Sequence, residues 1–489
     1  MIARRTRNRA LATAVLVTFA LLLAACGGSS STKSSSASGG ASGADATPAD
    51  AAVFVSVNTD LSSSQWKTVD TLLTKFPGKD KTLASTRASF ETQSGLNWET
   101  DVKPALGAEL DFVALDVSNA AGGVALTQPK DQSKFDALVA KANAKKAGSL
   151  VTEKVGDWTV ISDKQASIDA YKTRASGKKL SDDATFKTAM GELSGDALAK
   201  VYVNGPKVQT ALQSSANPLA QGAAQGTFDW AVAELVAQAD GVKLDGTFKG
   251  QPFKGVQQPA AYSPKLLGSV PSGALVVIDF KGGSSLNSLD SAAGAGVPQL
   301  QGAMGFIKQL TPIFKNETVL SVSPGTPIPA ITLIAEPDSA AQAVAGIDAL
   351  VTQFGALAGG ATAQQTTIGG HSVKELNLGR FAVDYGVIDG KLVVTSSRQA
   401  IANFGKGASV NDDAAFKDAK SASGMPDAVS TLMYVNIKDG LSLIESLSQL
   451  SGTAIPANQT ENLRPLTSFI AYGTGDSGTG KFTAFLQIK

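Results

Sequence analysis

From residue 48 onward, short apolar runs rich in β-branched residues recur along the chain. Residues 52–57, 109–117 and 122–128 are such runs, and each predicts a strand. A hairpin is expected at residues 150–163, where two such runs flank Gly156 and Asp157, a dipeptide suited to a tight turn. Strands are therefore expected in adjacent pairs, which favours antiparallel pairing.

Other segments repeat their apolar residues every three or four positions, which is the helical pattern. Residues 62–76 place Trp66, Val69 and Leu72 on one helical face, and residues 131–144 also predict a helix. Because strands arrive in pairs rather than in strict alternation with helices, we expect an α+β fold. Each sheet should be mainly antiparallel, with helices packed on one face.

The whole pattern occurs twice. The hexapeptide DDATFK at Asp182 returns as DDAAFK at Asp412, an offset of 230 residues. Five further segments recur in the same order, with offsets that drift by only a few residues. A chance match would not keep this order, so we expect two tandem homologous units, residues 48–262 and 263–489. Each unit should form its own α+β domain.

The first 25 residues predict an export signal. Arg4, Arg5, Arg7 and Arg9 form a positive start, and residues 10–25 are uncharged and largely apolar. This order and length are typical of a signal peptide. A transmembrane helix is the alternative, but sixteen residues are short for a span.

The end of that segment favours a lipid anchor. Leu23, Ala24, Ala25 and Cys26 match the bacterial lipobox, in which small residues precede a cysteine that is lipidated and becomes the new N-terminus. Cys26 is the only cysteine in the chain. Two or more acyl chains on this residue would hold the protein stably on a membrane, whereas one would not.

Residues 26–47 are rich in Ser, Gly and Ala, which is typical of a flexible tether. After Ala25 the chain has no apolar run long enough to cross a bilayer. The sequence therefore predicts a folded body held close to the outer face of the cytoplasmic membrane, with the membrane as partner through Cys26.

Composition removes several classes of function. The net charge is +1, which gives no basic surface for nucleic acid. A single cysteine excludes an internal disulfide, and a single histidine leaves few options for metal binding or for histidine-based catalysis. We therefore expect no cofactor, no nucleotide, no nucleic acid and no metal site.

The paired acids of the repeated hexapeptide allow two interpretations. Asp182 with Asp183, and Asp412 with Asp413, could bind a cation or do acid–base work. The alternative is structural: Asp182 or Asp412 would cap a helix, and the next aspartate would pair with the lysine four residues later. The phenylalanine of each hexapeptide would then point inward. The structural interpretation is the stronger.

A glycine-rich stretch, residues 473–481, partly matches three functional motifs. Its spacing fits a dinucleotide fingerprint, most of a P-loop, and the nucleophile loop of chymotrypsin-like proteases around Ser477. Each nucleotide motif needs a helix directly afterwards, whereas residues 481–489 look like a strand. The protease needs a histidine partner, and His371 lies in no such motif. A hairpin loop is expected here, and His371 should follow a turn and enter a strand.

Two apolar features could form part of a ligand site. The four tryptophans all lie in the first unit, and packing in the core is the default expectation, with a ligand platform as the alternative: Trp66, Trp98, Trp158 and Trp230. Residues 286–314 are weakly charged and rich in small and apolar residues. We expect a helix that its many Ala and Gly residues make less stable, and the alternative is a mobile helix that lines a groove.

The chain resembles a family of uncharacterised, mostly actinobacterial envelope lipoproteins that carry the domain of unknown function 3352. The resemblance rests on the lipobox, the Ser-rich tether, PADAAVFVSVN at Pro48, GLNWETDVKPALGAELDFVALD at Gly95, and DDATFK. It covers nearly the whole mature chain. It implies location and architecture, but it supplies no activity and no catalytic residue.

Three classes of function remain after these exclusions. The first is a non-catalytic binding or scaffold protein of the cell envelope, with an envelope protein as partner. The second is a carrier or chaperone for a lipid or other apolar ligand. The third is an enzyme with an unrecognised site, which the absence of a catalytic constellation disfavours.

Overall fold

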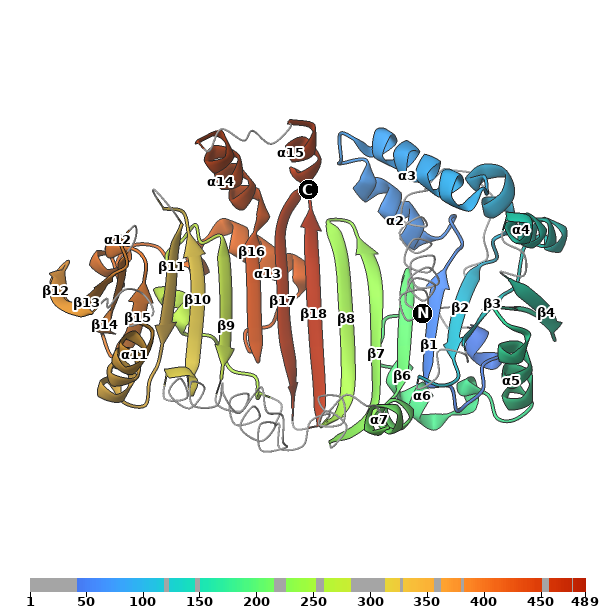
Figure 1. The fold of residues 1–489 in the computed structure, drawn as a ribbon, viewed down its shortest axis with the longest axis horizontal. Coiled ribbons are helices and arrows are strands. Elements are labelled where there is room, and N and C mark those ends of the chain that lie inside the picture. Colours follow the sequence, from blue (N-terminus) through green and yellow to red (C-terminus); the bar gives the residue numbers. More distant parts are fainter. Residues whose placement is uncertain are drawn as a thin grey trace.

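The computed structural model describes residues 42–117, 123–145, 150–214, 226–251, 259–282, 313–325, 329–355, 362–379, 382–450, 457–476 and 478–489. Within these ranges the fold is α+β, with a large antiparallel sheet and several helices. The sequence prediction of a mainly antiparallel α+β fold is therefore confirmed. The described strands all join in one 18-stranded sheet, which the sequence did not predict (Figure 1).

Every described strand pair is antiparallel, and the pairings fix the order across the sheet. In that order the strands are β4 (Val151–Val155), β5 (Trp158–Ser162), β3 (Gly123–Thr127), β2 (Glu109–Ala114), β1 (Val53–Asn58), β6 (Ala199–Asn204), β7 (Thr227–Gln238), β8 (Gly241–Gln251), β18 (Thr479–Ile488), β17 (Leu466–Asp476), β16 (Thr431–Asn436), β9 (Val276–Lys281), β10 (Glu317–Ser323), β11 (Ala330–Ala335), β15 (Lys391–Thr395), β14 (Ala382–Ile388), β13 (His371–Asn377) and β12 (Ala363–Ile368). The pairing of β8 with β18 joins the N-terminal and C-terminal halves of the chain.

Helices lie at the two sides of the sheet, beyond both ends of its strands and, in the case of α13, behind the central strands (Figure 1). They are α2 (Ser64–Leu73), α3 (Lys79–Ser94), α4 (Gln132–Lys145), α5 (Gln165–Ala175), α6 (Ala184–Met190), α7 (Gly205–Gln213), α11 (Ala340–Gly355), α12 (Arg398–Ala402), α13 (Ala414–Ser423), α14 (Ile437–Leu450) and α15 (Ala457–Leu463). Short helical turns precede several strands and helices, among them η1 (Ser42–Asp45), η4 (Leu180–Asp182), η5 (Leu266–Ser269) and η6 (Val410–Asp412).

One face of the sheet, here called the core face, carries the main hydrophobic cores. Phe186 of α6 meets Tyr202 of β6 edge to face, with ring centroids 5.0 Å apart. Phe416 of α13 meets Tyr434 of β16 in the same way at 5.1 Å. Each aromatic pair lies within a cluster of buried residues, one in each half of the sheet. Both phenylalanines therefore point inward, as the sequence predicted.

Helices also pack on the opposite face, which corrects the expectation that they cover one face only. Trp66 and Leu72 of α2 cluster with Ala237 of β7 and Ile488 of β18. At the other end of the sheet, α11 packs in the same way on β11 and β15. Successive residues of a strand point to opposite faces, so Ala237 faces away from the core that Val232 joins.

Several local predictions are confirmed. The hairpin at residues 150–163 is β4 and β5, and Gly156 adopts the positive φ of 62° that the turn needs. The glycine-rich stretch covers the end of β17 and the start of β18, which pair as a hairpin, so a strand and not a helix follows it. His371 begins β13 directly after a glycine turn.

Candidate functional site

The predicted anchor lies outside the described residues. This holds for Cys26 and for Leu23, Ala24 and Ala25 of the lipobox, and it also holds for Ser477 and nearly all of residues 286–314. Among the described helices, none is both long and apolar enough to cross a membrane.

The paired acids cap helices, with a correction of one residue. Asp183 accepts a hydrogen bond from the Phe186 amide at 2.8 Å, and Asp413 accepts one from the Ala415 amide at 2.8 Å. The N-caps are therefore Asp183 and Asp413, not Asp182 or Asp412 as predicted, because a helical turn of three residues ends at the first acid of each pair. Within the described ranges, neither cap forms an ion pair with the lysine four residues later.

Asp412 has a different role from its neighbour. Its carboxylate accepts hydrogen bonds from the amide and the hydroxyl of Ser409, at 3.0 and 2.9 Å, in a capping box. These hydrogen bonds lower the pKa of the Asp412 carboxyl. Such an acid stabilises a local turn, and no group of three or more metal-ligating side chains occurs in the described part of the chain.

The tryptophans are core residues. Their exposed fractions are 4% for Trp66, 1% for Trp98, 8% for Trp158 and 4% for Trp230. Trp66 also donates an indole hydrogen bond to the Asn58 carbonyl at 2.8 Å. Side chains this deeply buried offer no ring face to a ligand, so the packing interpretation is confirmed.

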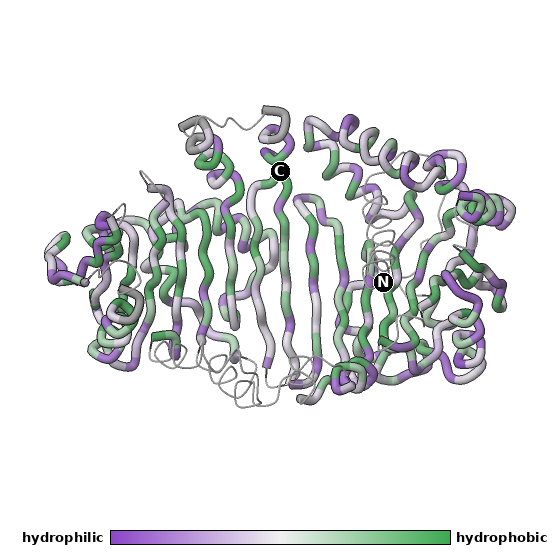
Figure 2. The backbone as a smooth tube through the Cα atoms, in the orientation of Figure 1, coloured by the Kyte–Doolittle hydropathy of each residue, from purple (hydrophilic) through white to green (hydrophobic). Residues whose placement is uncertain are grey.

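The face opposite the core face carries an unbroken apolar row, and we call this side of the sheet the open face. Direct cross-strand partners continue the row from β2 to β15 without a charged or polar residue. In sheet order the row is Leu110, Val57, Ala199, Leu235, Leu244, Ala484, Ala471, Met433, Ile278, Leu320, Leu333 and Val394. Figure 2 shows hydrophobic residues recurring along the same central strands.

The two neighbouring rows on the open face are also free of charge. One runs through Val242, Leu486, Phe469, Val435, Val276 and Val322. The other runs through Ala233, Gly246, Phe482, Gly473, Thr431 and Phe280. On the core face, by contrast, one row of the N-terminal half contains Asp111, Ser56, Lys200, Glu234 and Asp245. In this row the polar side chains lie on the core face, whereas a sheet with one buried face usually places them on the solvated face.

The central part of the open face is partly accessible, although Val242 and Leu486 pack against the cluster that contains Trp66 of α2. Four large apolar side chains on β7, β8, β16 and β18 are substantially exposed: Leu235 at 36%, Leu244 at 38%, Met433 at 39% and Phe482 at 40%. With strands about 4.8 Å apart, the seven strands from β7 to β10 and three rows outline roughly 30 Å by 13 Å. We call this region the window. The largest apolar patch of a soluble protein is often of this size, and such patches are often functional.

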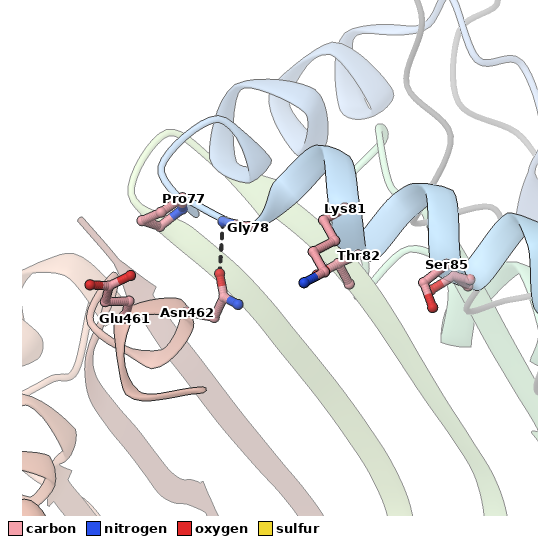
Figure 3. A pocket seen from close by; sticks show the side chains of 8 residues that line it. Pro77, Gly78, Lys81, Thr82, Ser85, Glu461 and Asn462 are labelled. Atoms are coloured by element: carbon pink, nitrogen blue, oxygen red, sulfur yellow. Dashed lines mark hydrogen bonds between the residues drawn. The ribbon is translucent and has the colours of Figure 1, made fainter. Parts of the chain in front are cut away.

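A polar cleft of about 370 Å³ lies between α3 and α15. Figure 3 shows Lys81, Thr82 and Ser85 on the α3 side, with Glu461 and Asn462 on the α15 side. The Asn462 side-chain oxygen accepts a hydrogen bond from the Gly78 amide at 2.8 Å. The cleft thus joins a helix of the N-terminal half to one of the C-terminal half.

Two carboxyl groups are fully buried under the core face. Asp111 and Asp279 have exposed fractions of 0%. Burial raises the pKa of Asp111 to about 8, and the nearby Glu109 carboxylate adds to this. Burial likewise raises the pKa of Asp279 to about 7. Both groups are therefore largely protonated under mildly acidic conditions.

Comparison with known proteins gives no assignment. No family model matches the chain, and no curated protein matches it. Among solved structures, crystal form IV of TP0453 is similar at 16% identity with a TM-score of 0.24, over 43% of this chain and 75% of that chain. Crystal form III is similar at 15% identity with a TM-score of 0.24, over 43% and 74%. Likeness this weak carries no argument about fold or function.

Sequence reasoning missed the window, although its signal is present. The strand TLMYVN, for example, carries large apolar residues at both alternating positions, which is typical of strands buried on both faces. Only the strand order reveals that the apolar residues of one face form a continuous row across the described strands. The window is therefore a product of register, not of any local motif.

Proposed function

We propose that this protein is a lipid-anchored protein of the cell envelope that binds the acyl chains of a lipid on the window. The observation that supports this most directly is the apolar row, which crosses the window without a charged or polar side chain. The proposed anchor at Cys26 would keep the window close to a membrane that supplies such lipids.

Three properties of the window favour acyl chains over a protein partner. Every strand of the window is hydrogen-bonded on both sides, so its backbone offers no edge to a peptide. Its three rows contain no Arg, Tyr or Trp, the residues that dominate protein interfaces. An acyl chain spans about 15 Å, half the thickness of a bilayer core, and fits within the outline of the window.

Binding and transport of an apolar ligand require no catalytic group, which agrees with the proposal that the protein is not an enzyme. Docking of an envelope protein on the same surface is the competing scaffold interpretation. It predicts a co-purifying protein chain in place of lipid, and that result would contradict the acyl-chain proposal.

The proposal is tested on residues 27–489, produced in a related host and extracted gently. Native mass spectrometry should detect a bound lipid. The variant Met433→Glu, which places a charge in the window, should weaken binding of a fluorescent long-chain fatty acid by at least about tenfold. Val117→Glu is the matched control, because Val117 has the same exposed fraction of 39% and lies outside the window.

Binding of the fatty acid by Met433→Glu with wild-type affinity would place the lipid elsewhere. A wild-type protein that is purified empty and takes up no fatty acid would contradict lipid binding altogether. Equal losses in Met433→Glu and Val117→Glu would point to a general effect of added charge.

The anchor gives a separate prediction. Replacing Cys26 with alanine should release a folded protein into the soluble fraction, because the proposed lipid on Cys26 would be its anchor and none of the described helices is long and apolar enough to cross a membrane. Membrane fractionation, together with the mass of the N-terminal peptide, measures this. Ser29→Ala in the same tether should remain membrane-bound. A Cys26→Ala protein that stays in the membrane after its signal is removed would show that a second anchor exists.

We further propose that the chain is a tandem duplication, with units near residues 48–262 and 263–489. The strand order β4–β5–β3–β2–β1–β6–β7–β8 supports this, since β14–β15–β11–β10–β9–β16–β17–β18 has the same connectivity. The aromatic pairs and the aspartate caps described above recur in both halves. The Leu180 amide donates to the Thr47 carbonyl at 2.8 Å, and the Val410 amide donates to the Val270 carbonyl at 2.8 Å.

A further inference from the structure

The segment that leads into β1, residues 42–52, lies across the core face as a strap. Tyr171 of α5 donates its hydroxyl to the Ala46 carbonyl at 2.8 Å. The Ala49 amide donates to the Lys178 carbonyl at 2.9 Å. Ala44 and Ala46 are buried. The strap is therefore an ordered part of the core, which corrects the prediction that residues 42–47 belong to the flexible tether.

Asp111 lies directly beneath this strap. Its exposed fraction is 0%, and neither carboxyl oxygen accepts a hydrogen bond. Gly43 is so close that a Cβ atom at this position would stand 1.8 Å from Oδ2 of Asp111. The strap thus seals the carboxyl against water, and only a glycine leaves room for it.

The groups around Asp111 do not compensate a negative charge. Ser56 of β1 lies opposite Asp111, and its hydroxyl lowers the pKa of that carboxyl less than burial and the Glu109 carboxylate of the same strand raise it. Tyr171 of α5 faces it and, because burial raises its own pKa to about 12, stays neutral. Lys200 lies two strands away in the same row and donates to the Gly195 carbonyl. An ionised Asp111 would therefore be buried with no positive charge beside it, which is strongly unfavourable.

We propose that the strap is a proton-operated latch, closed while Asp111 is protonated and released when Asp111 ionises. Release admits water to the carboxylate and frees residues 42–50 from the core face. If the tether is anchored at Cys26, release also lengthens it by about nine residues, or up to roughly 30 Å when extended. The distance of the folded body from the membrane would then respond to local pH.

Burial supports this by placing the pKa of Asp111 near 8, so release belongs to weakly alkaline conditions. The direction of the pH effect on closure follows from the proton that Asp111 binds. The closed state binds the proton that the open state loses, so closure is favoured at low pH and is lost as the pH rises through that value.

The corresponding segment of the C-terminal half provides an internal reference. There the Leu266 amide donates to the Glu317 carboxylate at 2.5 Å, and the Tyr262 hydroxyl donates to Asp279. The carboxylates beneath this segment thus accept hydrogen bonds from it, which stabilise their negative charge, whereas Asp111 accepts none from the strap. We expect the strap at residues 42–52 to respond more strongly to alkaline pH than residues 262–270.

Hydrogen exchange on residues 27–489 tests the latch. After correction for the intrinsic exchange rate, amides of the strap should lose protection by at least tenfold between about pH 6 and about pH 9. Strand β1 should keep its protection over the same range. The near-isosteric variant Asp111→Asn cannot ionise, so its strap should stay protected at both pH values.

A second variant separates the latch from general loosening. Gly43→Ala should expose the strap at both pH values, because its new Cβ would occupy the position of the Asp111 carboxyl. Equal protection of the wild-type strap at both pH values would overturn the proposal. An undiminished pH response in Asp111→Asn would overturn it as well, since the response would then come from another group.

Discussion

Replacing Phe416 with alanine is expected to lower the free energy of unfolding by about 3–5 kcal/mol. The Phe416 ring is 2% exposed, and it meets Tyr434 edge to face with the ring planes at 81°. Removal of the ring leaves a cavity at the centre of the C-terminal core and also ends the aromatic contact, which adds about 1 kcal/mol. Urea denaturation followed by circular dichroism measures the loss.

Phe186→Ala provides the matched test of this prediction. Its ring meets Tyr202 at 80°, so we expect a cost similar to that of Phe416→Ala. Phe482→Ala, at an exposed position of the window, should cost less than about 1 kcal/mol. A cost for Phe416→Ala no greater than that for Phe482→Ala would show that the aromatic pair is not a structural centre.

The free energy of unfolding should fall as the pH rises, and Asp279 should account for part of this fall. Burial raises the pKa of Asp279 to about 7 in the folded protein, whereas its ordinary value is about 3.9. The folded state therefore holds a proton that the unfolded state releases between these values. The contribution is complete below about pH 4 and is lost by about pH 7, with a size on the order of 4 kcal/mol.

Asp279→Asn should flatten this pH dependence, because the amide cannot ionise and its oxygen can still accept the Tyr262 hydrogen bond. Denaturant titrations at several pH values from about 5 to 8.5 measure the slope. Asp427→Asn is the control, since the Asp427 side chain is 93% exposed and should leave the slope unchanged. Parallel slopes for wild type and Asp279→Asn would assign the pH dependence to other groups.

Much of the local structure is predictable from the sequence. Alternation predicted β4 and β5 with their turn at Gly156, and helical spacing predicted α2 with Trp66 and Leu72 buried. These features depend on neighbours within a few residues. The caps were predicted one residue too early, because the short helical turns η4 and η6 end at the first aspartate of each pair.

The window and the strap were not predictable in this way. The window depends on pairings such as Leu244 with Ala484, which lie 240 residues apart. The strap reads as the end of a polar, small-residue tether, yet Gly43 is held against Asp111 across the core. In both cases the decisive contact joins distant segments, and no periodicity within either segment encodes it.

The pairing of β8 with β18 has a further consequence for self-association. Two separate sheets would have four free edges, at each of which unpaired amides and carbonyls could recruit a strand from another molecule. Joined as one sheet, the described strands leave only β4 and β12 at the edges. At one of them, Glu153 and Lys154 of β4 place charges that oppose the addition of another strand. The joint between the halves therefore protects a protein with an exposed apolar surface from growing into a fibril.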